Sequence, residues 1–448
     1  MTKTESTTTE PLIAPDFTWF NNARFGIFIH WGIYSVGQYE ASWSFFNHVP
    51  ERNWYSTLPH DQYMAQRHAF LARRFDPVAW CDLFKAAGAR YTVLTTKHCD
   101  GVALWDTAEG LSTVRDCSVG KDLVAPFVDA VRASGLHLGL YYSHCDWNHP
   151  DYASIRQPGG FTHLPPENPG YKYAYPEGPD DPVRWENFLR FHRLQLKELC
   201  ERFSPDLFWF DGQWERTSEQ WRCAELRKQL HEWRPGGLIL NGRMCGYGDY
   251  DTPEQGFPTI APKGHWEFCM TMNKFWGMAL DPSYKTAQEL VRTLCECAGM
   301  GGNLLLNVSP LSDGTIFYEQ ERILREMGAW LAVNGEAIYG THAGLALTHF
   351  YGPSTLSADR KTLNLFVFYR PWGEISVKGI RNKIKSITIV GHEGELQHRS
   401  SGGSEDIPGV LWISVPAEAC EPLGTVVKVE LDSPLDFYTG EGQIVSQN

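Results

Sequence analysis

The pattern of hydrophobic and polar positions along this chain changes near residue 340. Before that point, short and nearly continuous apolar segments alternate with longer segments in which apolar residues recur every three or four positions. Continuous apolar runs are typical of strands buried in a parallel sheet, and the longer spacing is typical of helices that cover such a sheet. The alternation predicts βα units with strands at 25–32, 91–98, 136–143, 206–212, 237–243, 266–269 and 303–308.

The helical pattern falls between these strands. It is clearest at 182–203, where Trp185, Phe188 and Leu189 begin a series of apolar residues at helical spacing. Gly135 follows one such segment, and a Pro-Gly-Gly run at 235–237 follows another, as expected at helix ends. We therefore predict helices at 78–89, 122–134, 182–203, 218–233, 287–298 and 318–333.

After residue 340 the apolar residues alternate in short runs at 363–369, 375–377, 387–390, 411–415 and 425–431, separated by Gly, Pro, Asn and Ser. This pattern indicates an antiparallel β-sandwich. The 448 residues leave room for a barrel of about 250 residues or more before it. The predicted fold is of the α/β class: a TIM-like (β/α) barrel over 16–340, a C-terminal antiparallel β-sandwich over 341–448, and a Thr/Glu-rich leader over 1–15 that we expect to be disordered.

Composition narrows the classes of partner. The net charge is -13 and the sequence has no run of Lys and Arg, which argues against binding to nucleic acid. We expect no membrane association, since the sequence contains no uncharged apolar stretch of about 18 residues. The eleven Cys are scattered and the leader lacks the apolar core of a secretion signal, so we expect a cytoplasmic protein unless a signal has been removed. The sequence leaves open whether the chain forms a homo-oligomer.

Candidate chemistry lies where the predicted strands end, because the loops at the carboxyl ends of barrel strands build the active site. Asp211 ends an aromatic run, Phe208 to Phe210, and Gly212 then lets the chain turn away without a side chain. Other strand ends carry His30, His98 and Arg243, which are donors able to keep a carboxylate ionised. We interpret Asp211 as the nucleophile of a retaining glycosidase.

A retaining glycosidase needs a second carboxyl group about 5–5.5 Å from the first, as general acid and then general base. Two residues on later segments are candidates. Glu254 lies in a loop rich in Gly, Tyr and Pro that could reach over a pocket, and Glu267 lies in a strand-like segment from which it should point into the barrel mouth.

Several long motifs resemble the α-L-fucosidases of glycoside hydrolase family 29. They occur in the family's order over about residues 15–340, ahead of a β-rich tail where the family has its sandwich. The matching residues are Trp19-Phe20, Arg24 to Gly32, Lys97 to Gly101, Leu140 to Ser143, Leu207 to Gly212, Trp266-Glu267 with Cys269 and Thr271, and Gly301 to Val308.

This resemblance implies hydrolysis of terminal α-L-fucosyl groups of a fucosylated oligosaccharide or glycoside by double displacement, with no metal or organic cofactor. It places Asp211 at the nucleophile position, favours Glu254 over Glu267 as acid/base, and places Arg243 beside the carboxylates. The other candidate sugar-binding residues are His30, Trp43, His98, Cys99, Tyr142, Trp209 and Trp276.

Two of these positions depart from the family. Cys99 stands where the family usually has a second histidine, and Ser42-Trp43 stands where it usually has Glu-Trp. Losing a hydrogen-bonded sugar contact typically costs ~1–3 kcal/mol, so either a neighbour such as Glu40, His48 or His144 compensates or the sugar differs.

Three alternatives follow from the same residues. A related L-sugar such as an α-L-galactoside is one possible substrate, and a non-catalytic sugar-binding protein would keep the same fold. A metallohydrolase is the third, because His98-Cys99-Asp100 and His144-Cys145-Asp146 contain zinc-ligand types, although neither has the spacing of a common zinc motif.

Overall fold

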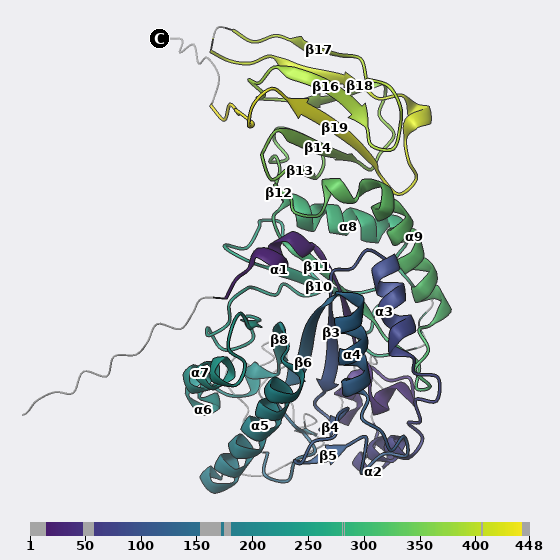
Figure 1. Cartoon of the computed structure of the whole chain (residues 1–448), viewed down its shortest axis with the longest axis vertical. Helices are drawn as coiled ribbons and strands as arrows, with labels where there is room; N and C mark the ends of the chain where they lie inside the picture. Colours follow the sequence, from purple (N-terminus) through teal and green to yellow (C-terminus); the bar gives the residue numbers. More distant parts are fainter. Residues whose placement is uncertain are drawn as a thin grey trace, which may run out of the picture.

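The computed structural model describes residues 15–47, 58–152, 172–173, 181–279, 281, 283–404 and 406–440. Seven parallel strands form a curled sheet in the order β10-β11-β1-β3-β6-β8-β9 (Figure 1). Their bounds are β1 (Phe25–Ile29), β3 (Tyr91–Lys97), β6 (His137–Ser143), β8 (Leu207–Asp211), β9 (Ile239–Leu240), β10 (Glu267–Thr271) and β11 (Asn303–Val308). All seven predicted strands are present.

An irregular extended segment at 249–255 closes the barrel between β9 and β10. On one side, the Asp249 amide donates to the Leu240 carbonyl at 2.7 Å. On the other, the amides of Glu267 and Cys269 donate to Asp251 and Pro253 at 2.9 and 3.0 Å. The ladder is interrupted, with single bridges in place of a regular strand. Glu254, expected in a loop, therefore lies on an eighth barrel position.

Helices cover the outside of the sheet (Figure 1). The structure contains α3 (Pro77–Ala86), α4 (Val124–Ser134), α5 (Pro182–Phe203), α6 (Ser218–Trp221), α7 (Cys223–Trp233), α8 (Ala287–Gly299) and α9 (Tyr318–Asn334), with a short α2 (His60–Ala65) in the loop after β1. The single helix predicted at 218–233 is two helices, because Arg222 adopts a left-handed φ of 51° that a right-handed helix cannot contain.

The barrel interior has a core of its own. Phe28, Tyr141 and Trp209 belong to it, whereas the apolar residues between sheet and helices form a second cluster. Helix α1 (Thr18–Ala23) closes the amino-terminal end of the barrel, where Phe20 packs against Tyr91 and Tyr250 with ring centroids 6.0 and 4.8 Å apart. Ligands must therefore enter from the carboxyl ends of the strands.

The C-terminal part is an antiparallel sandwich with a separate hydrophobic core. One sheet has the order β12-β13-β14-β19-β16 and the other β15-β18-β17. Their bounds are β12 (His342–Ala343), β13 (Ser354–Leu356), β14 (Thr362–Val367), β15 (Glu374–Val377), β16 (Ile384–Ile389), β17 (His398–Ser401), β18 (Val410–Ser414) and β19 (Thr425–Leu431). Helix α8 lies between this sandwich and the barrel strands, and α9 runs along the side of the barrel next to α3 (Figure 1). The predicted fold class is confirmed; the boundary at 340 stays a prediction.

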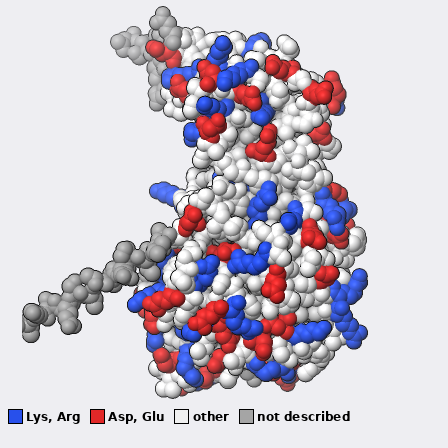
Figure 2. Space-filling model, viewed as in Figure 1, with Lys and Arg blue, Asp and Glu red and all other residues white. Residues whose placement is uncertain are grey.

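Four short strands lie in the connecting loops: β2 (Phe46–Asn47), β4 (Val102–Ala103), β5 (Leu111–Ser112) and β7 (Lys172–Tyr173). Acidic and basic side chains are interspersed on the face drawn in Figure 2. Among the described helices, none is long and apolar enough to cross a membrane. The predicted leader lies almost entirely outside the described residues, as does His48.

Candidate active site

Three charged side chains form a row at the carboxyl end of the barrel. Asp211 ends β8, Arg243 follows β9, and Glu254 lies on the segment that closes the barrel next to β9. One guanidinium nitrogen of Arg243 donates to Asp211 Oδ1 at 2.5 Å, and the other donates to Glu254 Oε2. The three residues occupy consecutive positions around the barrel, although Asp211 and Glu254 are 43 positions apart in the sequence.

Burial and the neighbouring Arg243 have opposite effects on the pKa of Asp211. Burial raises the pKa of Asp211, and Arg243 together with the Tyr141 hydroxyl partly offsets this effect. The Tyr141 hydroxyl lies 3.2 Å from Asp211 Oδ2. The side chains of Asp211 and Glu254 are 15% and 35% exposed, so both carboxylates are open to a ligand from solvent.

Tyr141, and not the predicted Tyr142, faces this row. Residues alternate between the two faces of a strand, and β6 turns Leu138, Leu140 and Tyr142 towards the helices. The Tyr142 hydroxyl donates to Gln195 of α5 at 2.8 Å, so its assignment to the sugar site is wrong. The two leucines marked the helix-facing positions in the sequence and could have identified Tyr141 as the inward residue.

His30 is held in one orientation and one tautomer. Its Nδ1 lies 2.7 Å from Asn307 Oδ1, while the Asn307 amide nitrogen donates to the Trp276 carbonyl at 2.8 Å. Since Asn307 Oδ1 can only accept, His30 carries its proton on Nδ1 and leaves Nε2 as an acceptor. Burial lowers the pKa of His30 to about 3, which keeps the ring neutral. Such a ring can accept a hydrogen bond from a sugar hydroxyl.

His98 and Ser42 contact each other. Ser42 Oγ lies 2.7 Å from His98 Nδ1 and accepts from the Asp100 amide at 3.0 Å. The His98 ring is parallel to that of Tyr141, with centroids 5.6 Å apart. Ser42 therefore orients a histidine at the barrel mouth.

Cys99 lies next to Ser143, whose hydroxyl is 2.7 Å from that of Tyr141. The Cys99 sulfur is buried, 3.4 Å from Ser143 Oγ and 3.1 Å from the sulfur of Cys145. Glu40 is buried next to Trp276, where it accepts from the Gly277 amide at 2.9 Å, and burial raises its pKa to about 8. Of the three neighbours considered for compensation, Glu40 contacts the loop that carries Trp276, whereas the His144 ring lies against His192 and reaches the row only through the Arg243 carbonyl.

Aromatic rings line the approach to the carboxylates. The guanidinium of Arg243 stacks on Trp209, 4.5 Å from the ring centroid. The indole nitrogen of Trp276 donates to Glu254 Oε1 at 3.1 Å, and its ring lies 5.0 Å from that of His30. Trp43 is half-buried and packs edge-on against Trp147, with centroids 5.6 Å apart. Trp209 and Trp276 thus contact the charged row directly, and Trp43 packs against a different aromatic ring.

Glu267 lies at the opposite end of the barrel, which corrects the expectation that it points into the mouth. It begins β10 and is completely buried. Its carboxyl group accepts from the hydroxyl of Tyr91 at 2.5 Å, the indole nitrogen of Trp209 at 2.9 Å and the hydroxyl of Tyr250 at 3.4 Å. Glu267 therefore supports Trp209 from below, and Glu254 is the carboxyl group beside Asp211.

A chain of buried hydrogen bonds that sequence reasoning missed fixes the backbone of Arg243. Arg193 of α5 lies 2.9 Å from His192 Nδ1, His192 Nε2 lies 3.1 Å from His144 Nδ1, and His144 Nε2 lies 3.2 Å from the Arg243 carbonyl. An arginine can only donate and a carbonyl can only accept, so every proton in the chain points towards Arg243. Burial lowers the pKa of His144 to about 3, so it stays neutral.

The two triplets considered for zinc have other partners. Asp100 accepts from the Tyr63 hydroxyl at 2.8 Å, and Asp146 pairs with the buried Lys97 at 3.3 Å. His98 and His144 contact Ser42 and His192 as described above. In the described part of the chain, no group of three or more His, Cys, Asp or Glu side chains is placed to hold a metal ion.

A β/α barrel with two carboxylates at the carboxyl ends of its strands is an arrangement found in glycoside hydrolases. The sequence matches the α-L-fucosidase family over residues 2–336. The tissue α-L-fucosidase of Rattus norvegicus is 31% identical over an alignment of 408 positions that covers 84% of this chain and 82% of the relative.

Two solved structures are also similar. The α-L-fucosidase isoenzyme 1 from Paenibacillus thiaminolyticus has a TM-score of 0.80 and 32% identity, covering 93% of this chain and 99% of that one. The Thermotoga maritima α-fucosidase, solved with a mechanism-based inhibitor, has a TM-score of 0.74 and 28% identity, covering 93% and 96%. The chain belongs to the α-L-fucosidase family of glycoside hydrolases.

The position of Glu267 predicts how stability depends on pH. Burial raises the pKa of Glu267 from 4.5 to about 7. Between these values the folded state holds a proton that the unfolded state has lost, so the free energy of unfolding falls as pH rises. Glu267→Gln does not titrate, and it should lose less stability than the wild type between pH 5 and pH 8, by at most roughly 1.4 kcal/mol per pH unit in this window.

Urea unfolding at the two pH values measures this difference. Glu418→Gln, at an exposed position on the sandwich, is the control and should behave as the wild type. An unchanged pH dependence in Glu267→Gln would contradict the burial of an ionisable group there.

The histidine chain predicts a shift in the pH–rate profile. The His144 ring stacks on Phe210 at 4.6 Å; His144→Phe puts another aromatic ring there but removes the bond to the Arg243 carbonyl. A less firmly held Arg243 offsets the burial of Asp211 less, so the acidic limb of kcat/KM for an aryl glycoside should move to higher pH. Misplacement of the site should also lower kcat/KM by about 10- to 100-fold.

Tyr142→Phe is the matched control. It removes a hydrogen bond to Gln195 of α5, the helix that also carries His192, and Tyr142 makes no hydrogen bond to Arg243. Its acidic limb should stay in place. A folded His144→Phe protein with the wild-type profile would show that the chain does not act on the site.

Proposed function

We propose that this protein is a retaining exo-glycosidase that releases terminal α-L-fucosyl groups, with Asp211 as nucleophile and Glu254 as general acid/base. The observation that carries the proposal is the single guanidinium of Arg243 that contacts both carboxylates. One side chain spanning the pair is compatible with the short separation, about 5–5.5 Å, that retaining enzymes need. Membership of the α-L-fucosidase family supports the choice of sugar.

In the first step, Glu254 donates a proton to the glycosidic oxygen while Asp211 attacks the anomeric carbon. The bond from that carbon to the leaving oxygen breaks, and an ester bond to Asp211 forms. In the second step, Glu254 removes a proton from water, the water oxygen attacks the anomeric carbon, and the ester bond breaks. Arg243 contacts both carboxylates, so it stays close to the negative charge in each step.

Residues around the row would hold the sugar. The neutral ring of His30 offers an acceptor at Nε2, and His98, oriented by Ser42, lies next to it with ring centroids 5.9 Å apart. Trp209 and Trp276 present flat faces on which the C–H groups of a sugar can pack. The cytoplasmic location and the absence of a metal or organic cofactor remain predictions from the sequence and its resemblance.

Kinetics of carboxylate variants test this proposal. Asp211→Ala and Asp211→Asn should lower kcat on aryl α-L-fucoside by on the order of 10⁴-fold or more. Glu254→Ala should slow substrates with poor leaving groups far more than aryl fucosides with good ones, and azide should restore its activity, because a small anion can attack where the general base is missing.

The substrate panel includes aryl α-L-galactoside and other L-configured aryl glycosides, which tests the sugar together with the chemistry. Glu267→Ala is the control for the second carboxylate. Near-normal turnover by a folded Asp211 variant would refute the nucleophile, and azide rescue confined to Glu267→Ala would reverse the acid/base assignment.

A further inference from the structure

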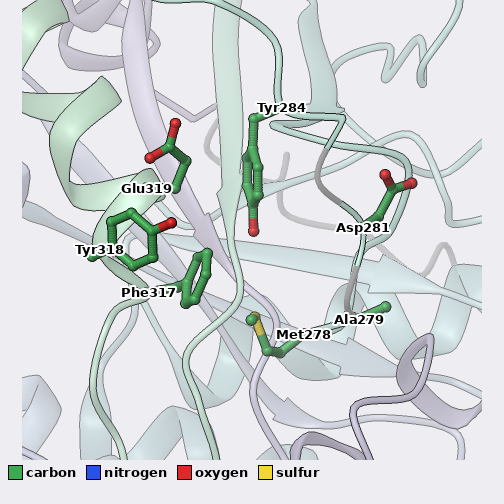
Figure 3. Close-up of a pocket in the computed structure, with 7 residues that line it drawn as sticks. All are labelled: Met278, Ala279, Asp281, Tyr284, Phe317, Tyr318 and Glu319. Atoms are coloured by element: carbon green, nitrogen blue, oxygen red, sulfur yellow. The ribbon is translucent and has the colours of Figure 1, made fainter.

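A cavity of about 320 Å³ lies between the loop that follows β10 and the start of α9. The loop contributes Met278, Asp281 and Tyr284, and the helix start contributes Phe317, Tyr318 and Glu319. Figure 3 shows Tyr284, Phe317 and Met278 around a common space, with Glu319 and Asp281 on opposite sides of it. Both segments leave the carboxyl ends of barrel strands, so the cavity is at the same end of the barrel as Asp211.

One loop connects the cavity to the catalytic row. Trp276 donates to Glu254 at 3.1 Å, the Gly277 amide donates to Glu40, and Met278 lines the cavity. The Trp276 carbonyl is fixed by Asn307 of β11, so the loop is anchored at this point. Three consecutive residues therefore join the proposed acid/base to the cavity lining.

The lining suits a neutral molecule with apolar faces and hydroxyl groups. The rings of Tyr284 and Phe317 are nearly parallel, 6.1 Å apart at 21°, and Tyr318 is 69% exposed at the rim. A hydrogen bond from Ser283 lowers the pKa of Asp281, and one from Arg322 lowers that of Glu319, so both carboxylates are ionised acceptors at neutral pH. Lys274 and Arg322 lie next to these carboxylates and partly balance their charge.

We propose that this cavity binds the sugar to which the fucosyl group is attached. This inference rests on the proposed function. The general acid must protonate the oxygen that joins the two sugars, so the leaving sugar lies on the Glu254 side of the site. The loop that lines the cavity follows β10, the strand that pairs with the Glu254 segment. The cavity volume is at the lower end of the range of about 300–1,000 Å³ for small-molecule sites, which suits one sugar. The enzyme then prefers fucosylated oligosaccharides to simple fucosides.

The test compares a substrate with a sugar leaving group and one without. Tyr318→Ala removes the exposed ring, and kcat/KM should fall about tenfold on the preferred member of a panel of α-L-fucosyl disaccharides of galactose and N-acetylglucosamine. On α-L-fucosyl fluoride, which has no leaving sugar, kcat/KM should stay within about twofold of the wild type. Tyr318→Phe keeps the ring and should retain the disaccharide activity.

Tyr351→Ala is the control for loss of an exposed tyrosine, since Tyr351 is 79% exposed on the sandwich and should affect neither substrate. Equal losses on the fluoride and the disaccharides, or no loss on any disaccharide, would overturn the inference while leaving the proposed function intact. Failure of the wild-type protein to hydrolyse the fluoride would overturn the proposed function, and the inference with it.

Discussion

The guanidinium of Arg243 stands between two carboxylates that would otherwise repel each other at the edge of a hydrophobic barrel. Burial raises the pKa of Asp211, and the positive charge of Arg243 is the largest effect that lowers it. An arginine suits the place because its planar fork can meet two carboxylates at once and stays charged at every physiological pH. If Arg243 moved, both the position and the ionisation of Asp211 would change together.

Much of the surrounding structure holds this row in place. Strand β9 has only two residues, and the Asn241 side chain continues its pairing by bonding both the amide and the carbonyl of Phe210, at 2.8 and 2.9 Å. Beyond β9, the irregular segment at 249–255 carries Glu254 and closes the barrel. The chain from Arg193 through two neutral histidines reaches the Arg243 carbonyl from outside the sheet. Around Asp211, Arg243 and Glu254 the strands are short or irregular. Side-chain hydrogen bonds therefore hold the backbone there in addition to strand pairing.

Local patterns predicted the seven strands, most helices and the position of Asp211 at a strand end, because these features depend on burial and on the lengths of apolar runs. They could not predict which of two adjacent tyrosines faces inward, since Tyr141 and Tyr142 are chemically alike and only the neighbouring leucines distinguish their faces. The prediction for Glu267 was wrong because Glu267 is the first residue of β10 and not its last. The Trp266-Glu267 motif therefore lies at the amino-terminal end of the barrel. The histidine chain links His144 to His192, 48 positions later, and to Arg243, 99 positions later, and no local pattern reveals such contacts.

As the proposed nucleophile, Asp211 forms a covalent bond to the sugar. A 2-fluoro-fucosyl fluoride should form this ester and hydrolyse it slowly, so that the labelled protein can be digested and its peptides analysed by mass spectrometry. We expect one fluorofucosyl group per chain, on the peptide that carries Asp211, and none on an Asp211→Asn protein. A label on another carboxylate such as Glu254 or Glu267, or the same label on the variant, would contradict this role of Asp211.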